Sequence, residues 1–99
     1  MSSADPWNYN DIGIEYRRLR DFDAAVSAWS RAIELDADYG EALYNITLVH
    51  QLDLGDPRAA IPYWHRAIAA GENSAVTMAH LANAYSLCGR RAEALHWQG

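Results

Sequence analysis

The sequence predicts an all-α fold built from stacked antiparallel helix pairs. Shifting the chain against itself by about 34 or 35 residues aligns similar residue types along its whole length. Two amphipathic helical patterns fit within each period, and no stretch reads as a strand. Because repeats of this kind stack side by side, we expect an α–α superhelix of about two and a half to three repeats.

The two helices of each period are marked by different spacings of large and small residues. Tyr9, Ile12 and Tyr16 recur at intervals of three and four, which places them on one helix face, and similar types return at 43–50 and 78–85. Ala25 and Trp29 begin a second such face, and the same residue types recur within 60–68. We therefore expect helices at about 7–19, 22–35, 40–53, 57–70, 75–88 and 90–98.

Capping residues stand where these helices begin and end. Asp5-Pro6 and Asp56-Pro57 each combine an N-cap acid with proline at the first helical position, where its missing N–H costs nothing. Gly55, Gly71 and Gly89 follow helical patterns and predict their ends.

Small residues at fixed positions predict close helix packing around two tryptophans. Gly13, Thr47 and Ala82 each follow the large apolar residue of a first helix, where a bulky side chain would hold two helices apart. Trp29 and Trp64 take equivalent places in the second helices. We expect both tryptophans to lie in the core.

Length and composition predict one soluble domain over residues 1–99, with repeats at about 6–39, 40–74 and 75–99, the last incomplete. The net charge is −5 and the chain has no lysine, which argues against nucleic acid as a partner. No apolar run is long enough to span a membrane and no signal peptide is evident, so we expect a cytoplasmic protein. The single cysteine, Cys88, excludes an internal disulfide.

The series Tyr9, Ile12-Gly13, Tyr16, Ala25, Trp29 and Ala32 resembles the tetratricopeptide repeat, and the likeness extends over about residues 6–98. The sequence also departs from that pattern. His50 replaces the tyrosine of the second repeat, and one extra residue lies between His50 and Gly55. Ala37 and Glu72 replace the closing prolines. The run 60–71 also resembles the related Sel1-like repeats, which use the same helix-pair architecture.

The resemblance implies that first helices line the concave side of a right-handed superhelix, where partner segments are held. The predicted function is thus protein–protein interaction, with a peptide or helical segment of a partner in this groove. A lysine clamp for a C-terminal carboxylate is not expected, whereas the mapped arginines leave open an acidic partner. The mapped groove residues are Trp7, Asn10, Ile14, Arg17, Arg18, Tyr44, Leu48, Gln51, Asn83 and Leu87.

No pattern in the sequence indicates catalysis, a cofactor or a bound metal. The four histidines lack the i, i+4 spacing of a helical metal site, and no glycine-rich phosphate loop is present. The serines are not flanked by the glycines of a nucleophile elbow. We therefore predict a protein that is not an enzyme.

The last helical pattern stops without a capping helix. Leu95 and Trp97 fall in this final element, which would leave apolar surface uncovered. A longer array, self-association and a second protein would each cover it. The alternative function is therefore a self-assembling scaffold, with Leu95 and Trp97 at the contact between copies.

Overall fold

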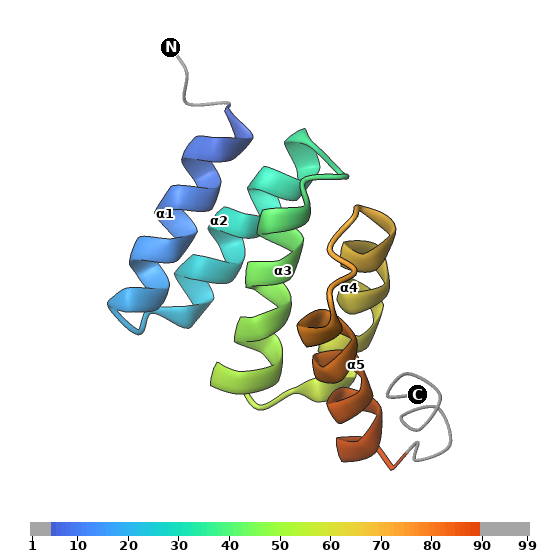
Figure 1. Cartoon of the computed structure of the whole chain (residues 1–99). Coiled ribbons are helices and arrows are strands. Elements are labelled where there is room, and N and C mark those ends of the chain that lie inside the picture. Colours follow the sequence, from blue (N-terminus) through green and yellow to red (C-terminus); the bar gives the residue numbers. More distant parts are fainter. Residues whose placement is uncertain (1–4, 90–99) are drawn as a thin grey trace.

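A computed structural model describes residues 5–89, and within them the chain is helical with no strand (Figure 1). The predicted all-α fold is confirmed. The helix expected at 90–98, together with Leu95 and Trp97, lies outside the described residues. The elements are α1 (Pro6–Arg18), α2 (Phe22–Leu35), α3 (Gly40–Leu48), the π-helix η1 (Val49–Asp53), α4 (Pro57–Ala69) and α5 (Ala75–Leu87).

The helices stack in chain order into an elongated array. α1 packs along α2, α3 and η1 pack along α4, and α5 packs against α4. In Figure 1, α3 and α5 lie in front of α2 and α4, while α1 and α5 occupy opposite ends of the array. The molecule measures 48 × 26 × 17 Å along its principal axes, so its two ends are well separated.

Side-chain caps fix the start of four helices. The carboxylates of Asp5 and Asp56 accept hydrogen bonds from Trp7 N at 3.1 Å and Ala59 N at 3.2 Å, as the sequence predicts. Asp21 and Ser74 cap α2 and α5 in the same way. Each cap satisfies a backbone N–H that the first turn of a helix leaves without a carbonyl partner.

The turn between the helices of a repeat uses a left-handed backbone conformation. Gly55 adopts it with φ 63° in the second repeat, and Arg20 adopts it with φ 64° in the first. Arginine rarely takes this conformation. Its guanidinium lies over the ring of Phe22, 5.3 Å from the centroid, which offsets part of the strain.

The core lies between the helix pairs and contains both predicted tryptophans. Trp29 and Trp64 are buried. Four alanines on the same two helices are fully enclosed: Ala25 and Ala32 on α2, and Ala60 and Ala67 on α4. The small alanine side chains let the helix backbones approach, and the indole rings fill the remaining space between neighbouring pairs.

The π-helix η1 takes up the extra residue of the second repeat. A single inserted residue widens one helical turn into a π-turn. Here the turn buries Val49 and Gln51, while His50 stacks on Tyr63 with ring centroids 5.6 Å apart and planes 9° apart. Burial lowers the pKa of His50, and the nearby carboxylate of Asp56 opposes that shift in part.

No described element covers the apolar face of α1. Leu43 and Ile46 of α3 are fully buried, but Ile12 and Tyr16 of α1 are 36% and 38% exposed. Leu19 at the end of α1 is 75% exposed. The spacing of three and four residues therefore predicts the apolar face of α1 correctly but not whether another element covers it.

We expect Gly13→Ala to destabilise the fold. A Cβ at Gly13 would lie 2.4 Å from Nε1 of Trp29 and 2.6 Å from its Cε2. Alanine gains about 1 kcal/mol over glycine in a helix, but overpacking of a full core costs about 1–3 kcal/mol. Urea unfolding should show a net loss of about 1 kcal/mol, and the loss should shrink in a Trp29→Phe background. A Gly13→Ala protein as stable as the parent would contradict the close approach.

Lowering the pH from about 7.5 to about 5.5 is expected to reduce the free energy of unfolding through His50. Since burial lowers the pKa of His50, the unfolded chain binds the proton first, below its ordinary pKa of about 6.5. The contribution of neutral His50 to the free energy of unfolding is therefore fully present above about pH 6.5. It is lost as the pH falls toward the lowered pKa of the folded protein. His50→Tyr should lose less stability over the same step in urea unfolding. Equal losses in both proteins would exclude this role.

Candidate interaction surface

The predicted groove residues that reach solvent lie on α1, α3 and α5. Trp7 on α1 is 65% exposed and Leu87 on α5 is 60% exposed. Ile14 and Asn83 are also exposed, and Tyr44 and Leu48 on α3 are half-buried. We call this set the first-helix face; its members are Trp7, Ile14, Tyr44, Leu48, Asn83 and Leu87.

Asn10, also mapped to the groove, is buried and joins three elements. Its carbonyl oxygen accepts a hydrogen bond from Nε1 of Trp29 at 3.2 Å. Its side-chain amide donates to the hydroxyl of Tyr39 at 3.4 Å and accepts from the amide of Asn45 at 3.1 Å. Asn10 thus ties α1 to α2 and α3, and its contact with a partner stays a prediction.

Gln51 links neighbouring helices in the second repeat, as Asn10 does in the first. Its Oε1 accepts a hydrogen bond from Nε1 of Trp64 at 2.7 Å, and its Nε2 donates to the carbonyl of His80 at 3.1 Å. The side chain is buried, because η1 turns it toward α4 and α5. Its polar atoms are therefore occupied within the chain, and its role in partner contact also stays a prediction.

Both arginines mapped to the groove have carboxylate partners inside the chain. Nε of Arg17 lies 2.6 Å from the carboxylate of Asp53, which links α1 to η1. Arg18 pairs with Glu15 one turn earlier on α1, at 3.2 Å. An acidic partner would have to compete with these carboxylates, so the arginines favour it less than their mapped positions alone indicate.

The ring of Tyr44 packs against the rings of Trp64 and His80. Its ring meets Trp64 edge to face at 5.6 Å, and the ring of His80 stacks flat on Trp64 at 5.3 Å. Tyr44 also contacts His80 edge to face at 6.4 Å. These contacts hold Tyr44 in place at the centre of the first-helix face.

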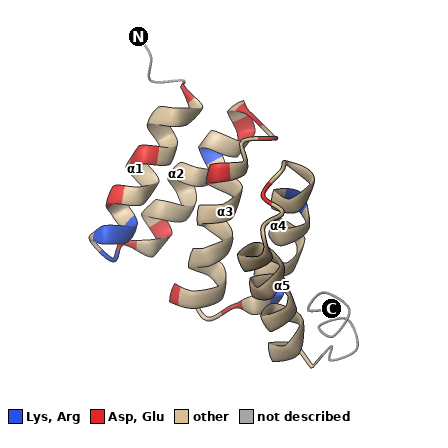
Figure 2. Ribbon diagram, viewed as in Figure 1, with Lys and Arg blue, Asp and Glu red and all other residues tan. Residues whose placement is uncertain are grey.

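Charge is absent from one half of this face. α5 contains no charged residue, and α3 carries only Glu41 near its start (Figure 2). Basic residues gather instead at the end of α1, at Arg17, Arg18 and Arg20. The α3–α5 half of the face is therefore suited to apolar and uncharged polar groups.

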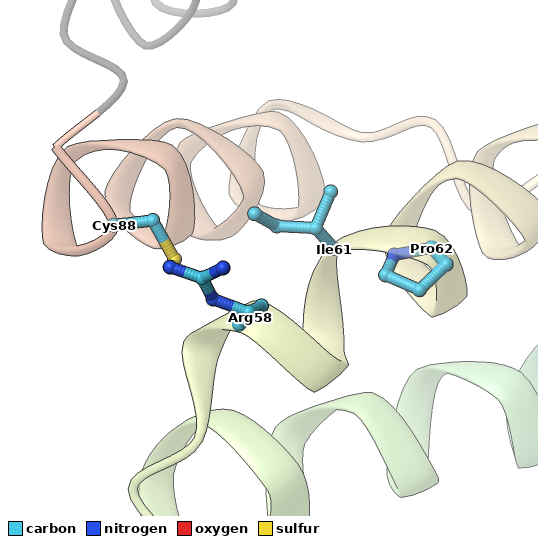
Figure 3. Close-up of a pocket in the computed structure, with 4 residues that line it drawn as sticks. All are labelled: Arg58, Ile61, Pro62 and Cys88. Carbon is cyan, nitrogen blue, oxygen red and sulfur yellow. The ribbon is translucent and has the colours of Figure 1, made fainter.

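A small hollow between α4 and the end of α5 does not suit an organic ligand. Arg58, Ile61, Pro62 and Cys88 line it, and Figure 3 shows the Arg58 and Cys88 side chains directed toward each other. Its volume of about 170 Å³ is below the several hundred that such ligands occupy. Among residues 5–89, no group of three His, Cys, Asp or Glu side chains could hold a metal ion.

A larger hollow lies outside the predicted groove, on the open side of α1 and α2. Its volume is about 530 Å³. The sequence carries a signal for this hollow. Ile12 and Tyr16 have the spacing of the apolar residues that are buried on α3, but no described helix precedes α1. The lining residues are Tyr9, Ile12, Tyr16, Ala24, Ser27, Ala28 and Arg31.

Comparison with known proteins agrees with the fold. A tetratricopeptide repeat family model matches residues 74–99. A crystal structure of MamA matches 96% of this chain with a TM-score of 0.89 and 25% identity, and a second matches 95% with a TM-score of 0.88 and 26% identity. The matches cover 55% and 51% of those chains, so this chain spans about half their length.

The N-terminal domain of stress-induced protein-1 (STI-1) from C. elegans matches 93% of this chain and 77% of its own, with a TM-score of 0.84. At 20% identity this likeness shows the fold alone. No curated protein matches the sequence. The predicted resemblance to tetratricopeptide repeats is confirmed, and this fold is generally a protein–protein interaction module. No helix within residues 5–89 is long and apolar enough to cross a membrane.

We expect Gln51→Met to lower the free energy of unfolding by about 1–3 kcal/mol, because it leaves the buried N–H of Trp64 without an acceptor. Methionine has a similar volume, so packing changes little. Urea unfolding would measure the loss, and adding Trp64→Phe should reduce it. Asn83→Ala, on the exposed side of α5, should change stability by less than about 0.5 kcal/mol. If the Gln51 and Asn83 changes lowered the free energy of unfolding equally, Gln51 would not be the acceptor that stabilises the buried N–H of Trp64.

Proposed function

We propose that this chain is an interaction module whose first-helix face holds a peptide or helical segment of a partner protein. The single observation that carries this proposal is the uncharged half of the face around Tyr44. Large side chains reach solvent there on α3 and α5 without a neighbouring charge on either helix except Glu41. An exposed apolar surface fixed on rigid helices is typical of a binding site.

The chemistry of the face favours an amphipathic segment. Tyr44 is already ordered by Trp64 and His80, so it loses little conformational entropy when a partner covers it. Leu48, one turn after Tyr44 on α3, and Leu87, at the end of α5, offer apolar contact on the same face. Asn83 carries both a hydrogen-bond donor and an acceptor and can pair with backbone amides of an extended or helical segment.

The proposal is tested by selecting ligands for the full-length chain from a displayed random-peptide library. Peptides that bind should carry apolar anchors, and fluorescence anisotropy should give affinities at least about tenfold weaker for Leu87→Glu, since a charge then enters an apolar contact. The matched control is Leu35→Glu, an exposed leucine on α2, which should alter affinity less than twofold.

Three results would count against the proposed face. Selected peptides could lose affinity equally with Leu35→Glu and Leu87→Glu, their binding could be indifferent to Leu87→Glu, or no peptide could be selected. Circular dichroism of each variant keeps a loss of folding separate from a loss of binding.

A second candidate function is self-assembly through the C-terminal end, at Leu95 and Trp97. These residues lie outside the described ones, and the observation that favours this function comes from the other end of the array. There, an apolar face on α1 is exposed to solvent, so both ends of a head-to-tail contact would carry apolar groups.

A further inference from the structure

The open side of α1 and α2 carries apolar side chains that no described element covers. We call it the N-terminal face and define it by Tyr9, Ile12, Tyr16, Leu19 and Ala28. Ile12, Tyr16 and Leu19 line a second hollow beside the first, of about 230 Å³. Two adjoining apolar hollows on one helix pair are suited to a helix that packs along α1.

The second repeat shows which kind of element covers such a face. Leu43 and Ile46 of α3 occupy the places of Tyr9 and Ile12 of α1 and are fully buried. α2, the second helix of the preceding repeat, packs against α3. By the repeat symmetry of the chain, the element that fits the N-terminal face is again a second helix.

Residues 90–99 have the sequence of a second helix. Ala94 aligns with Ala25 and Ala60, which are fully buried on α2 and α4. Leu95 aligns with Val26 and Ile61, which contribute to the core. The chain therefore contains one further segment with the residue pattern that covers first helices elsewhere in it.

We propose that the N-terminal face of one copy receives residues 90–99 of a second copy, so that copies join head to tail. This inference rests on the second candidate function and names the surface that would receive the C-terminal end. Each contact uses two different surfaces, so a pair of copies keeps one free face and one free C-terminal segment. Further copies can add there, in an open filament or a closed ring.

The same chain cannot supply the segment. The segment begins shortly after α5, and the end of α5 lies at the opposite end of the array from α1 (Figure 1). Ten extended residues reach at most about 35 Å, whereas the array is 48 Å long. A second copy therefore has to provide it.

Charge complementarity also favours this contact. Asp11 and Glu15 line the hollow on the outer side of α1 and both are exposed, although Glu15 already pairs with Arg18. Residues 90–99 begin with Arg90 and Arg91. Opposite charges at the rim of an apolar contact favour this pairing and make its assembly sensitive to salt.

The test is sedimentation velocity of the full-length chain and its variants over a range of concentrations. The unmodified chain should form oligomers as concentration rises. Ile12→Arg removes apolar contact and places a cation opposite Arg90 and Arg91, whereas Leu95→Asp with Trp97→Ser alters the segment. Each variant alone should stay monomeric, and Leu19→Arg, at a side chain 75% exposed, is a second face variant.

Mixing the two kinds of variant identifies the receiving surface. A mixture of Ile12→Arg with the Leu95→Asp, Trp97→Ser protein retains one intact face and one intact segment, so it should form a dimer and no larger species. Leu35→Arg on α2 is the matched control and should assemble as the unmodified chain does. Circular dichroism confirms that the variants fold.

The outcomes separate this inference from the function on which it rests. An unmodified chain that stays monomeric at every concentration would overturn both. Assembly that survives Ile12→Arg and Leu19→Arg but not the change at Leu95 and Trp97 would overturn the N-terminal face alone. A mixture that stays monomeric would likewise exclude a head-to-tail contact.

Discussion

The fold depends on two buried indoles whose N–H groups must find acceptors inside the array. Trp29 and Trp64 fill the space between helix pairs, and each donates a hydrogen bond to the first helix of its own repeat. Burying an indole removes its N–H from water, and an unpaired donor would cost about 1–3 kcal/mol. The same side chain therefore packs in the core and also constrains the position of the first helix of its repeat.

The two repeats meet this requirement differently, and the difference propagates through their structure. In the first, Trp29 reaches a backbone carbonyl, that of Asn10, and lies so close to α1 that only glycine fits at position 13. In the second, Trp64 bonds to the side chain of Gln51, which η1 has turned inward. Because Gln51 also donates a hydrogen bond to the carbonyl of His80 on α5, its side chain links the second repeat to the third.

These hydrogen bonds show why the sequence predicts the fold better than the surface. Helix pairs, caps and the buried tryptophans follow from local spacing, and the structure confirms them. The inward turn of Gln51 arises from the way an extra residue is accommodated, which an alignment by position does not resolve. The open face of α1 is a different case. Ile12 and Ile46 occupy equivalent places, but α3 packs against α2 of the preceding repeat, whereas no described helix precedes α1.

In a helical array, burial is thus a property of neighbours rather than of a residue's own repeat. A first helix must carry apolar side chains on the face that meets the preceding second helix, and at the start of the described array those side chains meet solvent instead. Tyr44 lies in the middle repeat, where its ring packs against Trp64 and His80, which suits a binding surface. Ile12 and Leu19 lie at the start of the described array, where no described helix covers their apolar face. The two proposed activities therefore use different parts of one repeat pattern, and substitutions in one can leave the other intact.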